Sequence, residues 1–578
     1  MKKIWNNDIT LSNLNETLEV YGWVAKKRDL GGLIFIDLRD RSGIVQLVIR
    51  PENKNYELAT TLKSEYVIKA SGVVNKRESV NTNINSGEIE INVEELELLT
   101  KSAELPFEIK EDTTALEDTR LKYRYLDIRR DSIKDKLILR SKLMNTIRNY
   151  FNDNEFIEVE TPVLCKSTPE GARDYLVPSR VNEGKFYALP QSPQLFKQLL
   201  MIGGIERYFQ IAKCFRDEDL RADRQPEFTQ VDMEMSFVDE DDVISMTEGL
   251  LKKVFKEVKG IDIKLPIDRM KYVDAIKYYG SDKPDLRYGM KIEELKELFN
   301  NTEIEFLKSA KNIDAIVVKD AADKYSRKDI DKLTEFVKKY KATGLIFLKY
   351  DEELTGSIAS KLSDSEKENI ISKLKLDKND LVFIISGEYN TVKTSLGALR
   401  CEIAKQLKLY SNSDYALTWV VDFPTFEWSE EEGRFMACHH PFTAPKKEDI
   451  DKLLNDKENC YSNAYDIVIN GYEAGGGSIR IHDAEIQDKM FEALELTKED
   501  IEEKFGFFVE ALKYGTPPHG GLALGLDRLT MLLCETDNIR DVIAFPKTTS
   551  ASDLMSECPN VVDSKQLDEL HIKLKDNI

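Results

Sequence analysis

The stretch from Leu189 to Val238 constrains the fold more than any other part of the chain. Ser192-Pro193 pairs a typical N-cap residue with the residue best suited to the first helical position. The apolar residues that follow recur at helical spacing as far as Gly203-Gly204. Residues 208–216 and 228–237 then alternate in character, with a loop of charged residues between them. The sequence therefore predicts a helix followed by a long-looped antiparallel hairpin.

The second strand of this hairpin has an unusual polar face. Its apolar positions are Val231, Met233, Met235 and Phe237. Because side chains alternate along a strand, Asp232 and Glu234 share the opposite face. Such a face is either an exposed amphipathic surface or the floor of a polar pocket. The nearby cations Lys197 and Arg216 favour a pocket for a ligand with both signs of charge, such as an amino acid with a nucleotide.

Several motifs carry a resemblance to a known family. Cys214–Glu218, with Arg224 and Glu227-Phe228 after it, resembles motif 2 of class II aminoacyl-tRNA synthetases. The helix predicted over 133–151, the strand over 156–161 and Pro162 resemble motif 1, and Gly515–Leu533 resembles motif 3. The Gln-Ser-Pro-Gln-Leu-Phe-Lys-Gln segment is similar to the aspartate-specific branch. Over nearly its whole length, the chain resembles the bacterial-type aspartate–tRNA ligases.

Length and charge limit what the 578 residues can be. With 41% hydrophobic residues, the chain is long enough for three or four domains, each with its own core. No apolar run is long enough to span a membrane and no apolar signal core opens the chain, so we expect no membrane partner and a cytoplasmic location. The net charge of −21 argues against a nucleic-acid partner, but basic clusters at 26–28 and 120–130 supply local positive charge.

The first hundred residues read as a small barrel. Five strand-like runs, with a helix-like piece near 56–63 after the third, have the pattern of an OB fold. Such barrels bind single-stranded nucleic acid through an exposed aromatic ring and basic residues, roles that Arg28, Phe35 and Gln46 fit. Phe35 could instead be a core residue, although its neighbours Ile34 and Ile36 would then face away from the core. The resemblance places the anticodon contacts at Arg28, Leu30, Phe35 and Gln46.

The predicted fold class is α+β multidomain. It comprises an N-terminal OB-fold β-barrel and a class II synthetase antiparallel-sheet catalytic domain that carries an inserted α/β domain. Residues 239–279 are predicted to be helical, and Gly280–Arg287 form a polar return. The basic residues and tyrosines of 120–130 either touch RNA or belong to a solvated hinge helix. The expected boundaries are 1–105 for the barrel, 106–132 for the linker, 133–287 and 413–578 for the catalytic domain with its C-terminal tail, and 288–412 for the insertion.

The segment 464–481 holds the second group of candidate site residues. Three glycines, 475–477, let the backbone and a ligand approach closely. Two acids, Asp466 and Glu473, can hold Mg²⁺ beside a triphosphate, and the planar guanidinium of Arg480 can grip a carboxylate. Arg480 with Lys197 would then form a cationic clamp for a side-chain carboxylate.

The resemblance extends these roles to other residues. It implies catalytic roles for Arg216 and Arg528. It implies aspartate binding by Glu170, Ser192, Gln194, Lys197, Asp232, His439, His440 and Arg480. It implies ATP binding by Arg216, Asp217, Glu218, Gln225, Glu473, Gly525, Leu526, Asp527 and Arg528.

The function implied is ATP-dependent ligation of L-aspartate to the 3′ end of tRNA(Asp) through an aspartyl-adenylate, with Mg²⁺ and in a homodimer. An asparagine–tRNA ligase, or an aspartate ligase that also charges tRNA(Asn), stays open. A free-standing asparagine synthetase would lack the N-terminal barrel. A noncatalytic RNA-binding paralogue is expected to have lost Arg216 or Arg528, and both are present.

Overall fold

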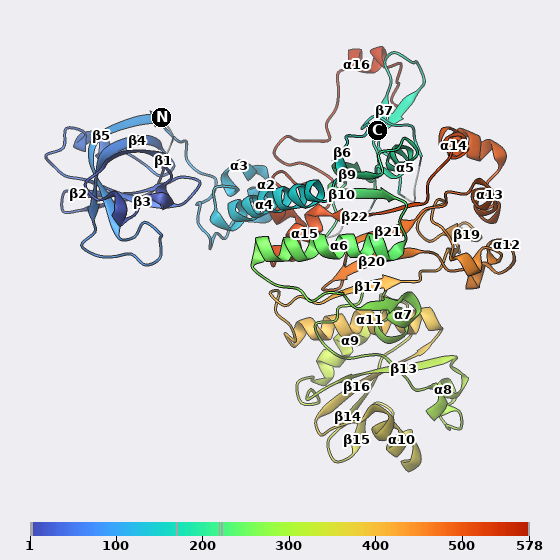
Figure 1. Ribbon diagram of the computed structural model, residues 1–578. Helices are drawn as coiled ribbons and strands as arrows, with labels where there is room; N and C mark the ends of the chain where they lie inside the picture. The colour runs from blue at the N-terminus through green and yellow to red at the C-terminus, as the bar shows by residue number, and fades with distance from the viewer. Residues whose placement is uncertain (1–3, 169–171, 219, 221–222, 576–578) are drawn as a thin grey trace. The chain divides into compact units, whose positions relative to one another are not determined.

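The computed structural model describes residues 4–168, 172–218, 220 and 223–575, which form two compact units. The first unit contains residues 1–138 with 544–548 and 552–560, and the second contains most of the remaining chain. Figure 1 colours the chain from its N-terminus to its C-terminus and labels the elements used below. Within the described residues, no helix combines the length and apolar character that crossing a membrane requires.

The first unit contains the predicted barrel. Its strands close in the order β1-β2-β3-β5-β4, with helix α1 (Tyr56–Thr61) following β3. The apolar side chains of alternating strand residues fill the interior, among them Val20, Ile36 and Leu47, which are fully buried. The prediction of an OB-type barrel is confirmed by this topology. The strands are β1 (Thr17–Leu30), β2 (Leu33–Arg39), β3 (Ile44–Ile49), β4 (Val67–Lys76) and β5 (Ile89–Thr100).

The segment after the barrel is more ordered than a simple hinge. It forms the short helices α2 (Glu117–Lys122) and α3 (Arg124–Asp127). Arg124 and Arg130 are buried, and their guanidinium groups pair with the Asp127 carboxylate at 2.9 and 2.7 Å. These two arginines therefore stabilise the segment, and the expectation that the whole cluster faces RNA or solvent is wrong for them.

A large sheet organises the second unit. Among the described residues it has eight strands in the order β11-β17-β20-β21-β22-β10-β9-β6. Antiparallel pairing dominates, and β11 and β6 pair in parallel at the two edges. The strands are β6 (Ile157–Glu158), β9 (Arg207–Phe215), β10 (Glu227–Ser236), β11 (Arg269–Lys271), β17 (Leu417–Val421), β20 (Ala464–Ile469), β21 (Tyr472–Ile479) and β22 (His519–Gly525).

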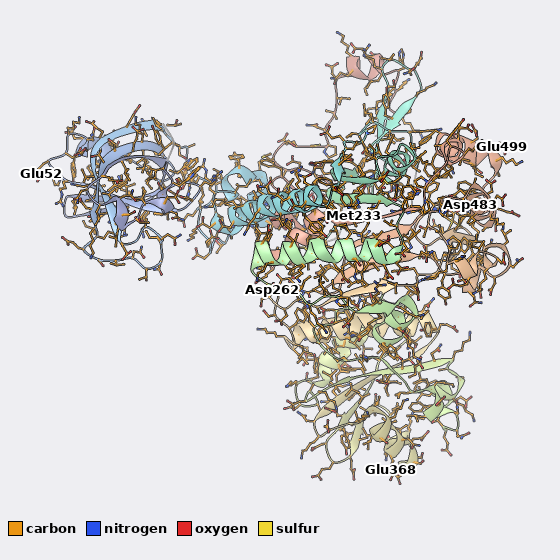
Figure 2. The ribbon with its side chains drawn as sticks, in the orientation of Figure 1. Glu52, Met233, Asp262, Glu368, Asp483 and Glu499 are labelled. Atoms are coloured by element: carbon orange, nitrogen blue, oxygen red, sulfur yellow. The ribbon has the colours of Figure 1, made fainter. Side chains whose placement is uncertain are left out.

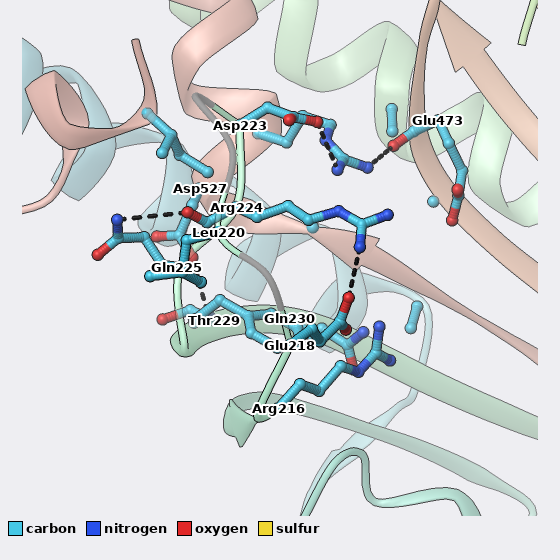
Figure 3. A pocket seen from close by; sticks show the side chains of 17 residues that line it. Arg216, Glu218, Leu220, Asp223, Arg224, Gln225, Thr229, Gln230, Glu473 and Asp527 are labelled. Atoms are coloured by element: carbon cyan, nitrogen blue, oxygen red, sulfur yellow. Dashed lines mark hydrogen bonds and ion pairs between the residues drawn. The ribbon is translucent and has the colours of Figure 1, made fainter. Parts of the chain in front are cut away.

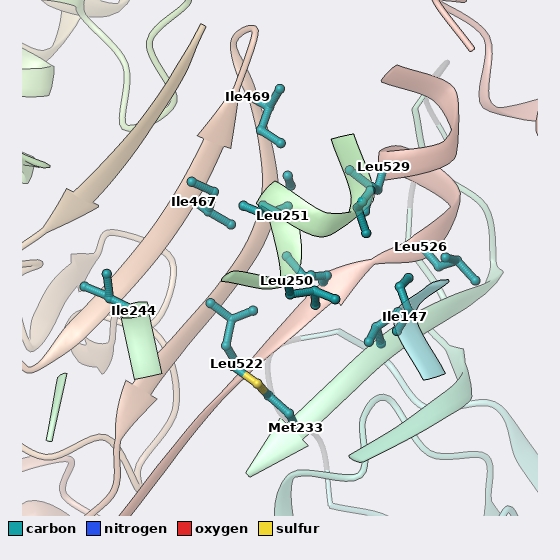
Figure 4. Close-up of a cluster of buried hydrophobic side chains, with 14 of the residues drawn as sticks. Ile147, Met233, Ile244, Leu250, Leu251, Ile467, Ile469, Leu522, Leu526 and Leu529 are labelled. Atoms are coloured by element: carbon teal, nitrogen blue, oxygen red, sulfur yellow. The ribbon is translucent and has the colours of Figure 1, made fainter. Parts of the chain in front are cut away.

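Three helices cover one face of this sheet. They are α4 (Asp131–Asp153), α6 (Glu240–Val254) and α15 (Leu526–Leu533). Figure 4 shows their side chains, such as Ile147, Leu250 and Leu529, gathered against Met233 and Leu522 of the sheet. Burying these side chains contributes roughly 1.5–3 kcal/mol each. The opposite face of β10 is thereby left for the polar residues of the site.

Acidic side chains dominate the outside of the molecule. Glu52, Asp262, Glu368, Asp483 and Glu499 are all exposed, whereas Met233 lies in the interior (Figure 2). Because the surplus of acids is solvated in this way, it opposes nonspecific association with nucleic acid without acting on the buried site.

Three local predictions differ from the structure. The sequence predicted Ser192 as the N-cap and Pro193 as the first helical residue. In the structure the helix α5 (Gln194–Ile202) begins one residue later, at Gln194, and the Ser192 hydroxyl accepts a hydrogen bond from the Gln194 amide at 2.9 Å. β10 ends at Ser236, and Phe237 is 68% exposed with φ +61°, so it does not continue the apolar face. Residues 239–279 are only partly helical, because a π-helical turn at Phe255–Lys259 ends the first helix before β11 and α7 (Tyr272–Tyr279).

An inserted α/β layer follows α7. Its sheet has the order β12-β13-β16-β14-β15. Alternating residues of β13 and β16 face two separate cores, so helices pack on both sides of this sheet. Its elements are β12 (Glu293–Glu294), α8 (Glu305–Ser309), β13 (Asn312–Val318), α9 (Arg327–Lys338), β14 (Ile346–Tyr350), β15 (Leu354–Gly356), α10 (Asp364–Leu374), β16 (Asp380–Gly387) and α11 (Tyr389–Gln406).

Smaller elements complete the second unit. They include two hairpins and several helices near the end of the chain. These are β7 (Leu176–Pro178), β8 (Phe186–Ala188), β18 (Phe426–Ser429), β19 (Arg434–Ala437), α12 (Lys452–Asn455), α13 (Ala484–Ala493), α14 (Lys498–Leu512) and α16 (Ser564–Glu569).

Two of the three glycines of β21, Gly475 and Gly477, are required by how closely β22 packs against it. A Cβ atom at Gly477 would lie 2.0 Å from the Gly521 carbonyl oxygen, far inside van der Waals contact. We expect Gly477→Ala to destabilise the second unit by roughly 1–3 kcal/mol, since the backbone must shift to admit the methyl group. Thermal unfolding measures this as a lower apparent Tm. Gly344→Ala is the matched control because no atom lies within 4 Å of its Cβ, and an equal loss there would contradict the packing argument.

Candidate active site

Two adjoining cavities open on the polar face of the large sheet. The larger, of about 370 Å³, extends from α5 across β10 to β20 and β21. The other, of about 160 Å³, lies beside the charged loop between β9 and β10, and Glu473 lines both cavities. The predicted residues that line the larger cavity are Ser192, Gln194, Lys197, Arg216, Asp232, His439, His440, Asp466, Glu473 and Arg480.

Lys197 and Arg480 lie in the same cavity, held by two buried acids. The Lys197 ammonium is 2.6 Å from Asp232 Oδ1 and 3.3 Å from Glu234 Oε2. Arg480 donates from Nε and Nη2 to the two oxygens of Glu234, at 2.9 and 3.2 Å. All four side chains are buried. The two cations are therefore matched by two carboxylates, Asp232 and Glu234. The sequence prediction assigned no role to Glu234, even though the strand alternation placed it on the same face as Asp232.

The two acids differ in how their surroundings shift the pKa. Burial raises the pKa of Asp232, despite the opposing effect of Lys197. Burial would also raise the pKa of Glu234, but Arg480 and Lys197 outweigh it and hold this pKa below its ordinary value. Within the described residues, Asp232 Oδ2 and Gln194 Nε2 have no hydrogen-bond partner. These two atoms are available to a substrate ammonium and carboxylate respectively.

The adjacent histidines, His439 and His440, contact different partners. Nη1 of Arg480 lies 2.8 Å from Nε2 of His440, whose Nδ1 accepts from the Phe442 amide at 3.2 Å. Burial and the Arg480 charge lower the pKa of His440 well below its ordinary value, so this ring is neutral. His439 packs edge-on against Phe423, with Nε2 3.9 Å from Asp466 Oδ1. Burial acts to lower the pKa of His439, but the Asp466 carboxylate outweighs it and raises this pKa to about 10.

The smaller cavity gathers residues predicted to bind the nucleotide (Figure 3). Arg216 lies over the Phe228 ring, 5.1 Å from its centroid. Arg528 contacts Asp223 at 3.2 Å and also donates to the Glu473 carbonyl oxygen. The cavity thus brings two guanidinium groups to one concave surface suited to phosphates. The predicted nucleotide residues that line it are Arg216, Glu218, Gln225, Glu473, Gly525, Asp527 and Arg528.

Asp217 and Leu526 line neither cavity, and Asp527 makes further contacts beside its place in the smaller one. Asp217 lies against Arg173, with its carboxylate 3.5 Å from the guanidinium. The Leu526 side chain is buried in the main core, and the Asp527 carboxylate accepts from Arg140 and from the Thr229 amide at 2.5 and 2.7 Å. Asp527 therefore also positions β10 relative to α15. Glu170 lies outside the residues that the structure describes.

The candidate metal ligands approach each other above Gly476. A Cβ at that glycine would be 2.3 Å from Asp466 Oδ1 and 3.8 Å from Glu473 Oε1. Burial and then the Asp466 carboxylate raise the pKa of Glu473. Across the described ranges no group of three potential metal-binding side chains forms. Two carboxylates of this kind fit Mg²⁺, which takes few protein ligands and completes its shell with water and substrate phosphate oxygens.

Three of the four predicted anticodon residues, Arg28, Phe35 and Gln46, lie together on the barrel, with Gln46 itself buried. Arg28 Nη2 is 2.6 Å from Asp37 and 3.3 Å from Gln46 Oε1, and its guanidinium carbon lies 6.0 Å from the Phe35 ring centroid. Phe35 faces away from the core, opposite the buried Ile34 and Ile36. Leu30 is 64% exposed at the end of β1. Two residues that the prediction missed, Arg77 and Glu90, bond to Gln46 at 3.0 and 2.8 Å.

Comparison with known families agrees with this geometry. Residues 18–99 match the family described as OB-fold nucleic acid binding domain. Residues 116–549 match the family described as tRNA synthetases class II (D, K and N). The chain therefore belongs to the class II tRNA synthetases, in the group specific for D, K and N, which confirms the predicted fold class.

Within that class, the relatives that match the chain from end to end are named aspartate–tRNA ligase. The relative from Macrococcus caseolyticus is 53% identical, over 98% of this chain and 97% of its own. A relative from Streptococcus thermophilus is 51% identical, over 99% of both chains. The resemblance to this branch that the motifs carry is thereby confirmed.

Solved structures share the fold at much lower identity. Asparaginyl-tRNA synthetase from Pyrococcus horikoshii, complexed with asparaginyl-adenylate, superposes with a TM-score of 0.59 at 18% identity, over 95% of this chain and 98% of its own. A putative aspartyl-tRNA synthetase from Leishmania major Friedlin has a TM-score of 0.58 at 19% identity, over 93% of both chains. These likenesses concern the fold alone.

Proposed function

We propose that this chain activates L-aspartate with ATP and transfers the aspartyl group to the 3′ end of tRNA(Asp). One observation supports this above the others: the buried side chains of Lys197 and Arg480 line one cavity, and both pair with Glu234. A dicarboxylic amino acid offers this cavity the carboxylate that two adjacent cations attract. The names of the full-length relatives point to the same substrate.

Selection against asparagine follows from the orientation of Arg480. Glu234 occupies the Nε and Nη2 edge of the guanidinium, while Nη1 donates to Ser478 Oγ at 2.6 Å and lies 2.8 Å from His440 Nε2. A ligand carboxylate would therefore meet Nη1 by replacing one of these two partners, in the cavity that Lys197 also lines. A side-chain carboxylate accepts from both cations. The side-chain amide of asparagine presents N–H donors to these N–H donors, and leaving a buried charged donor without an acceptor costs about 3 kcal/mol.

Activation needs positioning and charge stabilisation, with no side chain as nucleophile. The substrate α-carboxylate attacks the α-phosphorus of ATP, with pyrophosphate as the leaving group. Arg216 is proposed to neutralise the α-phosphate and Arg528 the γ-phosphate, while Asp232 and Gln194 orient the amino acid. Asp466 and Glu473 would hold Mg²⁺, which when bound supplies further charge neutralisation at the phosphate oxygens.

The barrel and the β6 edge of the large sheet suggest two further partners, tRNA and a second copy of the chain. The Arg28, Phe35 and Gln46 surface is proposed to bind the anticodon, because a stacking ring and charged hydrogen-bonding groups lie side by side there. The edge near β6 exposes Ile157, Val163 and Leu164, about half of each being accessible, which supports a homodimer that covers this edge. The cytoplasm is the proposed location, where such a partner tRNA is found.

Two assays test the proposal. We expect ATP–pyrophosphate exchange to depend on aspartate and to be about 100-fold weaker with asparagine, which corresponds to the cost of a buried charged donor left without an acceptor. Exchange with asparagine at an equal rate would contradict the assignment of substrate. Charging of purified tRNA(Asp) and tRNA(Asn) then separates an enzyme that serves only the first from one that serves both.

A further inference from the structure

The loop at 280–287 connects α7 to the inserted layer and begins at a close crossing with α11. Gly280 has φ +66°, and a Cβ there would lie 2.0 Å from the Lys393 carbonyl oxygen. A Cβ at Gly397 would lie 2.7 Å from the Gly280 carbonyl oxygen. The two backbones therefore approach as closely as glycine allows, and α11 of the inserted layer determines where the loop starts.

A buried arginine of the same helix holds the other end of the loop. Arg400 is 1% exposed and donates from Nη2 to the carbonyl oxygens of Asp285 and Gly289, both at 3.0 Å. Its guanidinium lies over the rings of Tyr279 and Tyr288, at 5.0 and 4.6 Å from their centroids. Charge-assisted bonds to backbone oxygens fix a loop independently of its side chains. The inserted layer thus anchors this loop at both ends.

The middle of the loop reaches the active site. Asp282 lines the larger cavity, and Lys283 Nζ lies 3.8 Å from Glu473 Oε2 and 3.2 Å from Asp282 Oδ2. Lys283 itself lines neither cavity, but it contacts Glu473, which lines both. The Lys283 side chain is 44% exposed, which leaves its ammonium weakly held by these acids.

This position suits a cation that changes partner when ATP enters. A polyphosphate carries more negative charge than the carboxylates that now face Lys283, and its oxygens would arrive beside Glu473. The Lys283 ammonium can move towards these oxygens because it sits on a flexible four-carbon stem. Arg480 cannot move in this way, since it is buried and bidentate with Glu234.

We propose that Lys283 is a further catalytic residue, which binds the polyphosphate of ATP and the departing pyrophosphate, and that Arg400 is the positioning residue that holds its loop. This assignment rests on the proposed function for its substrate. It gives the inserted layer a definite part in the reaction, as the support of one wall of the site.

Kinetics of ATP–pyrophosphate exchange test the role of Lys283. Lys283→Met is expected to raise the KM for ATP and for pyrophosphate about tenfold each, the effect of losing one charge-assisted hydrogen bond, and to leave the KM for aspartate within about twofold. Lys283→Arg keeps the charge and should recover most of the loss. Lys311→Met is the matched control, since Lys311 also faces a glutamate, Glu388 at 3.0 Å, on the exposed surface of the inserted layer.

Calorimetry measures pyrophosphate binding directly, without enzymatic turnover. Binding of inorganic pyrophosphate, measured in EDTA, should weaken about tenfold in Lys283→Met and remain unchanged in Lys311→Met. Unchanged or tighter pyrophosphate binding by Lys283→Met would overturn the assignment, because Lys283 would then act only as a counter-ion of Glu473. The pyrophosphate-binding test does not depend on whether the amino-acid substrate is aspartate. Aspartate exchange by the unaltered enzyme, together with unchanged KM values in Lys283→Met, would refute Lys283 alone.

A double-mutant cycle tests the positioning role. Arg400→Lys is expected to raise the same two KM values, and its effect should vanish in the Lys283→Met background, because both act on one contact. Additive effects would overturn the positioning role. Arg400→Lys is preferred to a neutral substitution since it keeps a buried cation among the carbonyl oxygens that Arg400 contacts.

Discussion

Arg480→Leu is expected to lower kcat/KM for aspartate in pyrophosphate exchange about 100- to 4,000-fold. Arg480 is buried and bidentate with Glu234, and it lines the same cavity as Lys197. Removing one partner of such a pair costs about 3–5 kcal/mol, and each 1.4 kcal/mol is a factor of ten. Arg480→Lys keeps the charge but loses the two parallel bonds, so we expect a smaller loss.

Two controls show whether the loss concerns the substrate. Arg327→Leu removes an exposed arginine that contacts Asp331 at 3.3 Å, and should leave exchange unchanged. ATP binding by Arg480→Leu should also persist, because the nucleotide cavity is lined by other residues. Aspartate-dependent exchange near the unaltered rate in Arg480→Leu would refute the cationic clamp.

The second large effect is expected from Glu234→Gln, which keeps the shape of the side chain and removes its charge. Glu234 is fully buried between Lys197 and Arg480. Its loss leaves two buried cations facing the single carboxylate of Asp232, at a cost of about 3–5 kcal/mol. We expect an apparent Tm lower by about 5 °C or more, together with weakened aspartate exchange.

The pH dependence of this effect has a definite sign. Arg480 and Lys197 hold the pKa of Glu234 below its ordinary value of 4.5, so its charged form stabilises the fold above that pH. The difference in Tm between the unaltered protein and Glu234→Gln should be complete at pH 7 and shrink as the pH falls below 4.5. Asp153→Asn, which removes an exposed partner of Lys253, is the control and should show almost no difference. A similar small effect in Glu234→Gln would contradict the buried-network argument.

Local sequence was sufficient for elements with a strong periodic pattern. The barrel strands follow alternation of buried and accessible residues, and Phe35 lies opposite Ile34 and Ile36 as that alternation requires. It was not sufficient for the ends of elements. Phe237 is apolar and continues the alternation, yet the strand ends at Ser236 with a residue of positive φ, which sequence pattern does not reveal.

The active site also contains residues that local sequence predicted and residues that it did not. Lys197, Asp232 and Arg480 were predicted from motifs, because a motif specifies which residue types occur and how far apart they lie in the chain. The partner of Arg480 could not be predicted, because Glu234 lies 246 positions away in the chain and meets it only through the pairing of β10, β22 and β21. Lys283 was missed for a similar reason: a polar return carries no sign of which cavity it will face.

By itself, the sequence determined the class of fold, the order of its domains and the residue types available for chemistry, because these depend on periodicity, glycine placement and charge along short stretches. The tertiary structure alone decided which charges neutralise one another. Ion pairing depends on distance and burial, which are properties of segments brought together by the sheet. For this reason Glu234 and Asp232 together balance the two cations, and a loop held by the inserted layer supplies the proposed third cation.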